Sequence, residues 1–353
     1  MTKKDYTIGL DLGDKRHEVC VLNAVGEAEK KYSITNTRES LDKLAKAYPG
    51  ATVAMEAGTH SPWISRHLKS LKMKVLVANP RKLRAIYESD NKNDERDAEM
   101  LARLARFDPG LLYPIVHNSE PYQRSMAKLK GRDAHVSART KLINTTRGQL
   151  KSQGTKLPAG LHADAFARKA REHLEEVDLD MVAHMLDSIA DVSERIHIMD
   201  KEIDSVSKTD YPQAMRLRVI PGIGPVTALA FVLTIEDPNR FIDTRQVGPF
   251  LGLTPKRDQS GDTDKQLRIS KAGNKMLRRL LVTSAQYILG AFGPPSALRD
   301  TGLRIAGSSG SKIAKKRAVV AVARKLAVLM IALWKDPQMT YQAFPNAQKQ
   351  IAA

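Results

Sequence analysis

The sequence has a single cysteine, few aromatic residues and no hydrophobic run long enough to cross a membrane. Cys20 is the only cysteine among 353 residues, which excludes an intrachain disulfide and a cysteine-based zinc site. The longest late apolar run, residues 326–334, is far shorter than the ~20 residues that a helix needs to span a bilayer. The polar start MTKKDYT does not resemble a signal peptide. We therefore expect a soluble protein of a reducing compartment, with no membrane partner.

Acidic residues are also scarce relative to basic ones. The chain has 39 Asp and Glu against 57 Lys and Arg, so its formal net charge is +18. A surplus of this size is typical of proteins that bind a polyanion, and no long amphipathic segment points to a membrane surface. Nucleic acid is therefore the expected partner. The length allows a large core and two or more domains.

The stretch DYTIGLDLGD, residues 5–14, predicts the first strand of a sheet. Its apolar side chains recur with the two-residue period of a strand that has one apolar face: Tyr6, Ile8, Leu10 and Leu12. The same period places Asp11 on the polar face. A carboxylate in a sheet is costly without a cation nearby, so Asp11 is a candidate metal ligand. The alternative is a surface aspartate beside a turn at residues 13–14.

The segments that follow complete the pattern of an α/β domain over residues 1–117. Short links predict that two further strands form an antiparallel meander with the first. Helices and strands then alternate: helix 39–48, strand 51–55, helix 62–71, strand 74–78, and helices that begin at Pro80 and Asp94. This order is that of an RNase H-like (RuvC-like) fold, although other α/β domains share it.

Three more acidic residues lie on elements that this fold would place beside Asp11. Glu56 ends the strand 51–55, and Asp94 and Asp97 open the last helix in NKNDERDAEMLARL. Asp94 and Asp97 are three residues apart and share a helix face, although acidic residues in a first turn also complement the helix dipole. Four convergent carboxylates would repel one another without cations. The set therefore predicts a site for two Mg²⁺ ions that orient a phosphodiester.

The middle segment, residues 118–210, predicts two long helices. Between residues 182 and 206, apolar residues recur at alternating steps of three and four, which predicts a coiled coil. A preceding helix at 122–153 carries apolar residues at seven-residue spacing: Leu129, Val136, Ile143 and Leu150. The two helices either pair as an antiparallel hairpin or each dimerise across subunits.

The helix at 122–153 is also strongly basic, with eight Lys and Arg residues against Asp133 alone. A run of charge is often only a solvated face, but so large an imbalance favours contact with phosphates. The candidate nucleic-acid contacts on this helix are Arg124, Lys128, Arg132, Arg139, Lys141 and Arg147.

The third segment, residues 211–344, is expected to be mostly helical and to be followed by a disordered tail at 345–353. It contains the sequence PGIGP, residues 221–225, between two helical stretches. Helix, tight glycine turn and helix is the order of a helix-hairpin-helix module, whose backbone N–H groups bind a phosphate, so Gly222 and Gly224 are candidate contacts. A plain helical turn with glycine caps is the alternative.

A polar stretch at residues 250–274 contains two serines. Ser260 precedes a glycine and is either a nucleophile or part of a turn, whereas Ser270 is placed to cap a helix that begins near Lys271. A serine that attacks a phosphodiester must lose its proton while the phosphate charge is neutralised, so cations are expected beside it. The candidate cations of this stretch are Lys256, Arg257, Arg268 and Lys271.

Taken together, these segments resemble the DEDD-type insertion-sequence transposases related to the Piv DNA invertases, a family understood as bridge-RNA-guided serine recombinases. The match runs nearly end to end and comprises IGLDLG, AMEAGTH, KNDERDAEMLARL, VIPGIGPVTA, GLTPKRDQSG and RISKAGNKMLRRLL. The resemblance implies a RuvC-like catalytic domain at 1–117, a coiled-coil segment at 118–210 and a smaller transposase domain at 211–344.

The resemblance also assigns roles to residues. It implies that Asp11, Glu56, Asp94 and Asp97 form a magnesium-binding tetrad. It further implies that Ser260 is the nucleophile and forms a covalent phosphoserine link to DNA, because the family's serine precedes a glycine. Asn93 departs from the pattern, since many relatives have threonine there. The implied partners are donor and target DNA, an element-encoded guide RNA and further copies of the chain in dimers and tetramers, in the bacterial cytoplasm at the nucleoid.

The sequence therefore predicts a transposase or site-specific DNA recombinase of a bacterial insertion sequence. Two alternatives remain open. One is a RuvC-like nuclease or Holliday-junction resolvase that uses water in place of a serine. The other is a basic nucleic-acid-binding protein without catalytic activity, in which the carboxylates are structural.

Overall fold

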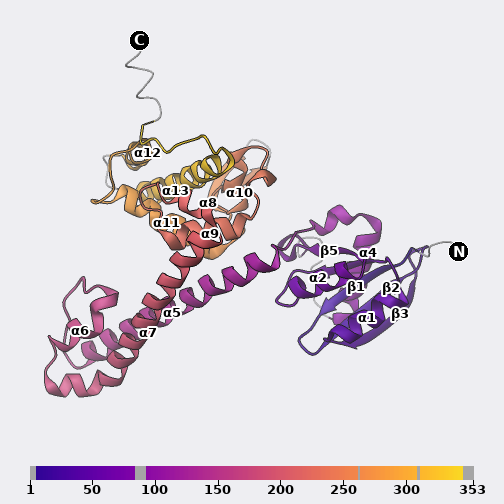
Figure 1. The fold of residues 1–353 in the computed structure, drawn as a ribbon, viewed down its shortest axis with the longest axis horizontal. Coiled ribbons are helices and arrows are strands. Elements are labelled where there is room, and N and C mark those ends of the chain that lie inside the picture. The colour runs from indigo at the N-terminus through magenta and orange to yellow at the C-terminus, as the bar shows by residue number, and fades with distance from the viewer. Residues whose placement is uncertain (1–4, 84–92, 261–262, 308–310, 345–353) are drawn as a thin grey trace, which may run out of the picture. The chain divides into compact units, whose positions relative to one another are not determined.

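The computed structural model describes residues 5–83, 93–260, 263–307 and 311–344 (Figure 1). The side chains of Asp258, Ser260 and residues 263–266 lie outside this description, as does the predicted tail at 345–353. The chain divides into two compact units, residues 1–117 and 118–353. Within the described ranges, every helix is too short or too polar to traverse a lipid bilayer.

The first unit is built on a five-stranded mixed sheet with the strand order β3-β2-β1-β4-β5. Its strands are β1 (Thr7–Leu12), β2 (Arg16–Leu22), β3 (Ala28–Thr35), β4 (Thr52–Glu56) and β5 (Lys74–Ala78). The first three strands pair antiparallel, whereas β4 runs parallel to both β1 and β5. The structure confirms the predicted antiparallel meander of the first three strands and the alternation of helices and strands that follows it.

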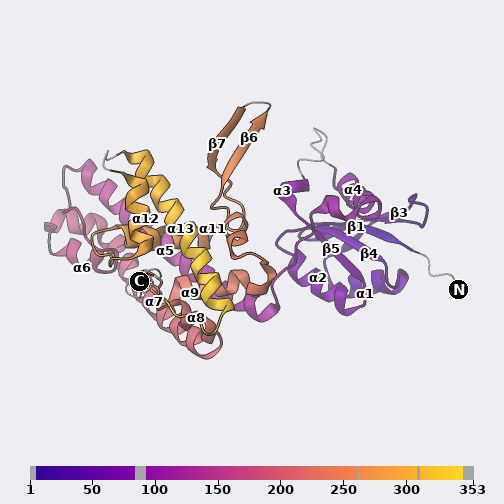
Figure 2. The same ribbon diagram turned by 90° about the horizontal axis from the view of Figure 1, so that it is seen from above.

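Helices cover both faces of this sheet (Figure 2). They are α1 (Arg38–Ala47), α2 (Ser61–Ser70), the short α3 (Pro80–Leu83) and α4 (Asp94–Phe107), followed by a 3₁₀ turn at Pro109–Leu112. Ile8 and Leu10 of β1 pack with α1 and α2 in the larger core of the unit. On the opposite face, Cys20 and Leu22 of β2 pack against α4. The two-residue period of the strands therefore separates two cores.

The second unit begins with a long helical hairpin. Helices α5 (Glu120–Ser152) and α7 (Glu176–Thr209) pack against each other, with a 3₁₀ turn at Ala163–Ala165 and α6 (Phe166–Arg171) between them in the chain (Figure 1). Contacts between residues 132 and 200, 139 and 193, and 146 and 185 show that they run antiparallel. Every seventh residue of the predicted seam in α7 is fully buried: Val182, Ile189, Ile196 and Ile203. Of the two predicted arrangements, this chain therefore forms the hairpin.

The rest of the second unit packs around α9 (Pro225–Ile235), in which nearly every residue from Thr227 onward is buried. Its neighbours include α8 (Pro212–Leu217), α11 (Lys275–Leu289) and α13 (Lys312–Lys335). The remaining elements are 3₁₀ turns at Pro238–Arg240 and Thr244–Gln246, α10 (Val247–Phe250), α12 (Ala297–Ala306) and the strands β6 (Pro255–Ser260) and β7 (Thr263–Ile269). The two strands form an antiparallel ribbon that extends from the helices (Figure 2). The sequence did not predict this ribbon or α12.

Candidate functional site

Asp11 lies on the face of the sheet that α4 covers. Its neighbours Leu10 and Leu12 belong to the core beneath α1 and α2, so the alternation of the strand directs Asp11 to the other side. Gly9 shares that side, because a side chain at Gly9 would meet the backbone of α4. The predicted polar face of β1 is therefore a partly buried face beneath a helix.

Glu56 ends the strand beside Asp11 and points to the same face. Strand β4 runs parallel to β1, with Leu10 opposite Met55, so Glu56 comes one step further along both strands, level with Asp11. Met55 belongs to the core under α1 and α2, whereas Ala54 packs with residues of α4. Alternation therefore places Glu56, like Ala54, on the α4 face.

The second pair of carboxylates comes from α4, whose close approach to the sheet depends on a glycine. A Cβ at Gly9 would overlap the carbonyl oxygen of Ala98 and lie 2.8 Å from the backbone nitrogen of Ala102. Only glycine allows this contact, and the buried alanines of α4 complete it. Asn93 caps the helix by accepting a hydrogen bond from the N–H of Glu95. Asp94 and Asp97 therefore lie in the first turn of a helix docked directly on β1.

The four carboxylates influence one another electrostatically. The pKa of Asp11 is raised from 3.8 to about 6, first by burial and then by the negative charges of Asp94, Asp97 and Glu56 in that order. Carboxylate oxygens are the donors that a hard divalent cation prefers, so the chemistry of these side chains suits such an ion. Their geometry does not yet form a site, because across the described ranges no three Asp, Glu, His or Cys side chains converge closely enough to hold an ion.

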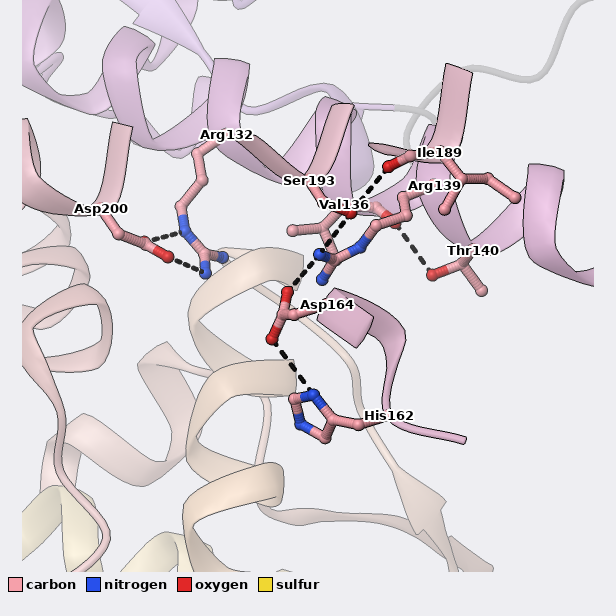
Figure 3. Close-up of polar contacts among 9 residues, drawn as sticks. All are labelled: Arg132, Val136, Arg139, Thr140, His162, Asp164, Ile189, Ser193 and Asp200. Atoms are coloured by element: carbon pink, nitrogen blue, oxygen red, sulfur yellow. Dashed lines mark hydrogen bonds and ion pairs between the residues drawn. The ribbon is translucent and has the colours of Figure 1, made fainter. Parts of the chain in front are cut away.

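Two arginines predicted to contact nucleic acid instead face the hairpin (Figure 3). Arg132 forms a bidentate ion pair with Asp200 of α7. Arg139 is only 8% exposed and pairs with Asp164 and with the hydroxyl of Ser193. Both lie in the seam between α5 and α7, where α7 and the intervening turn supply the missing acidic partners. Their prediction as phosphate contacts needs correction, because folding already neutralises their charge.

The other predicted contacts on α5 differ in their surroundings. Arg147 donates to the carbonyl oxygens of Leu157 and Pro158 and stacks on Phe166, so it holds the end of the hairpin. Arg124 pairs with Glu120, which lies in the helix because α5 starts two residues earlier than predicted. Lys128 and Lys141 are exposed and remain candidate phosphate contacts.

The PGIGP segment forms a tight turn that leads into α9. Gly222 adopts a positive φ of 85°, and Gly224 is the N-cap of α9, with Pro225 in the first position of the helix. The turn therefore leaves the positive end of a buried helix without a side-chain cap. Helix, glycine turn and helix follow one another as predicted, and phosphate binding by this turn stays a prediction.

The serine-containing stretch forms the β6–β7 ribbon in place of the expected loop. Ser260 is the last residue of β6 and pairs with Thr263 across the end of the ribbon. The side chains of Lys256, Arg257, Arg268 and Lys271 are exposed on or beside the ribbon. Ser270 does not cap a helix, because Lys271 and Gly273 have positive φ angles and α11 begins only at Lys275, capped by Asn274.

The sequence analysis missed two features that the fold reveals. One is the role of Gly9, whose signal is the spacing of small residues along α4 at Ala98, Ala102 and Ala105. The other is a cavity between the PGIGP turn and α11. Its lining residues come from segments some sixty positions apart in the chain, so no local pattern could have indicated it.

Comparison with known families agrees with this architecture. Residues 8–153 match a transposase family of the DEDD, IS110 type, and residues 214–299 match the transposase IS116/IS110/IS902 family. The DEDD family implies an RNase H-like fold and the use of a divalent metal. The mixed sheet of the first unit has the strand order that this fold requires.

Curated relatives cover most of the chain. The transposase for insertion sequence element IS1111A of Coxiella burnetii is 28% identical over 81% of this chain and 79% of its own length. The transposase for insertion sequence element IS1328 of Yersinia enterocolitica is 29% identical over 80% of this chain and 83% of its own. The pilin gene-inverting protein of Moraxella bovis is 25% identical over 92% of this chain and 94% of its own length. The chain therefore belongs to the IS110-type transposases, enzymes of DNA transposition and recombination.

Proposed function

We propose that this protein cuts and rejoins DNA strands at a magnesium site formed by Asp11, Glu56, Asp94 and Asp97, with Ser260 as the nucleophile. The observation that supports the metal site best is the raised pKa of Asp11. Its three causes after burial are the other three predicted ligands, which come from two separate elements. Such mutual repulsion within a fold is relieved when cations bind.

Each carboxylate has a defined part in this proposal. Asp11 and Glu56 supply oxygens from neighbouring strands, and Asp94 and Asp97 supply them from one face of α4. When two Mg²⁺ ions are bound, they would neutralise charge on the scissile phosphate and on the leaving oxygen. The sheet and helix hold the ligands in place, so little reorganisation would be needed at the moment of reaction.

The serine step proceeds by exchange of phosphodiester bonds. The Ser260 oxygen forms a bond to phosphorus as its proton leaves, and the bond from phosphorus to one deoxyribose oxygen breaks. That oxygen takes up a proton and leaves as a hydroxyl, while the chain retains a phosphoserine link to the other end of the DNA. Attack by a second DNA hydroxyl reverses the step and rejoins the strands. No external energy source is needed, because one phosphodiester replaces another.

The proposed partners are donor and target DNA, an element-encoded guide RNA, and other copies of the chain in a dimer or tetramer. The net charge of +18 supports nucleic-acid binding, as do the exposed Lys128, Lys141, Lys256 and Arg268. The guide RNA and the oligomers rest on the family resemblance alone. A protein of this kind would work in the bacterial cytoplasm, at the nucleoid.

The decisive test compares Ser260→Ala with Ser270→Ala on an element-end DNA substrate with Mg²⁺ and the element's RNA. We expect Ser260→Ala to abolish both strand cleavage and the denaturant-resistant adduct between protein and DNA, whereas Ser270→Ala retains both. Electrophoresis under denaturing conditions measures the two products. If cleavage persists in Ser260→Ala without an adduct, then water and not Ser260 is the nucleophile, as in a resolvase.

A second comparison separates an enzyme from a binding protein whose carboxylates are structural. Glu56→Gln should leave DNA binding in EDTA within twofold of wild type and remove Mg²⁺-dependent cleavage. Undiminished cleavage in this variant would remove Glu56 from the site.

A further inference from the structure

A cavity of about 470 Å³ opens within the second unit between the PGIGP turn and α11. Its walls are the segment from Arg218 to Gly224, Thr227 of α9, and four residues of α11: Leu280, Thr283, Ser284 and Tyr287. The volume lies in the range of sites that hold a small molecule or a single nucleotide. The four carboxylates of the proposed metal site are not among its lining residues.

Two largely buried residues, Thr227 and Ser284, line this cavity with hydroxyl groups that have no hydrogen-bond partner in the part of the chain that the structure describes. Thr227 is 8% exposed and Ser284 is 4% exposed. Other hydroxyls on the same two helices do bond to the backbone, since Thr234 donates to Ala230 and Thr283 donates to Arg279. Buried polar groups normally have partners, so these two are available to a ligand.

The chemistry at one end of the cavity favours an anion. Helix α9 starts there, and its N-cap Gly224 provides no side-chain acceptor for the first N–H groups. Arg218 also lines the cavity, and its guanidinium is already paired with Asp204. The backbone and hydroxyl donors are thus the groups that match the oxygens of a phosphate.

The cavity lining also includes an aromatic ring. Tyr287 is 46% exposed, and its ring lies against the PGIGP turn at Gly222, where a Cβ would come within 2.9 Å of the ring. The apolar side chains of Val219 and Leu280 line the same cavity. A nucleic-acid base stacks on such a surface regardless of its identity.

We propose that this cavity binds one unpaired nucleotide of a nucleic-acid strand, with its phosphate at the start of α9 and its base against Tyr287. The inference rests on the proposed function only in that the chain handles nucleic acid. It requires neither the metal site nor Ser260. DNA and RNA share the chemistry described, so either can supply the nucleotide.

The test measures binding by the full chain in EDTA, where no strand is cut. The probes are a 20-base-pair DNA duplex with one unpaired 2-aminopurine, the same duplex with an unpaired 2-aminopurine ribonucleotide, and a fully paired duplex. We expect the wild type to bind at least one bulged probe about fivefold or more tightly than the paired duplex, with quenched 2-aminopurine fluorescence. The bulged probe with the larger preference identifies the kind of strand.

Variants link this preference to the cavity. Tyr287→Ala should remove both the preference and the quenching, and the nearly isosteric Thr227→Val should reduce the preference about threefold. All variants should bind the paired duplex as the wild type does. Phe292→Ala is the matched control, because Phe292 is an 88% exposed aromatic residue of the same unit that does not line the cavity. It should change neither measurement.

The outcomes separate this proposal from the proposed function. Duplex binding without a preference for either bulge, or a preference that survives both cavity variants, would overturn the nucleotide site alone. Failure to bind any of the probes would also overturn the nucleotide site, but it would leave open the proposed chemistry, which is tested with Mg²⁺ and the element's RNA. Loss of strand cleavage in Ser260→Ala bears only on the proposed chemistry.

Discussion

Charged side chains gather in both units, but with opposite results. Around Asp11 the neighbouring charges have the same sign, and together with burial, the larger cause, they raise its pKa to about 6. In the hairpin, Arg132 and Arg139 meet Asp200 and Asp164, so cations and anions offset one another. Folding therefore neutralises the charges of the hairpin and concentrates those of the sheet. Charges that folding neutralises are structural, whereas like charges that folding brings together indicate a missing ligand of opposite sign.

The contrast between the carboxylates around Asp11 and the ion pairs of the hairpin predicts its largest effect for a variant that moves α4 without altering any charge. Gly9→Ala places a Cβ against the backbone of α4, so the helix must shift away from β1 and take Asp94 and Asp97 with it. We expect a loss of about 3 kcal/mol in the free energy of unfolding, from thermal denaturation, and at least a 100-fold loss of strand cleavage.

Gly58→Ala is the control for this variant. A Cβ at Gly58, in the same unit, would have no atom within 4 Å, so stability and cleavage should stay close to wild type. Full activity in Gly9→Ala would show that the docking of α4 does not determine the site.

In the hairpin, the same contrast predicts that Arg139 stabilises the fold and does not contribute to DNA binding. Arg139→Ala should lower the free energy of unfolding by about 2 kcal/mol, because it removes both the ion pair and the packing of the side-chain stem. Arg139→Met should recover most of this loss, and neither change should alter duplex affinity by more than twofold in a fluorescence titration.

The exposed Lys141 provides the contrast on the same helix. Lys141→Ala should leave stability unchanged and reduce the salt dependence of DNA binding by about one unit of slope. If Arg139→Met weakens DNA binding as much as Lys141→Ala does, then Arg139 is a DNA contact and its role is not only structural.

The smallest expected effect concerns pH in the absence of metal. Because the pKa of Asp11 is higher in the folded state than the value of 3.8 for a free carboxyl, this group destabilises the fold above pH 6. Its cost disappears as the pH falls from 6 to about 4. In EDTA at pH 7.5, Asp11→Asn should therefore be more stable than wild type by about 1 kcal/mol, a modest figure because solvent partly screens the carboxylate.

Thermal denaturation across this pH range, with and without Mg²⁺, measures the difference. The advantage of Asp11→Asn should vanish near pH 4, and added Mg²⁺ should raise the melting temperature of the wild type but not of the variant. A variant that is less stable than wild type at every pH would contradict the repulsion at this site.

Local periodicity accounts for what the sequence could predict. The alternation in residues 5–14 correctly directs Asp11 away from the core that contains Leu10, and the acidic first turn of α4 was identified with its correct start at Asp94. The partners of Arg132 and Arg139 could not be predicted in this way, because Asp200 and Asp164 meet them only through the pairing of two helices. The β6–β7 ribbon was missed because most of its residues are polar or charged, and Leu267 and Ile269 alone are too few to give a strand period.

Gly9 carries no charge and no reactive group, yet it sets the distance at which a helix bearing half of the tetrad approaches the strand bearing Asp11. The width of the proposed cation site would thus be controlled by a position outside it. A slightly wider spacing would suit calcium, which tolerates longer and less regular oxygen coordination, better than magnesium. Under this proposal, the choice of ion depends on how a backbone packs as much as on which acids are present.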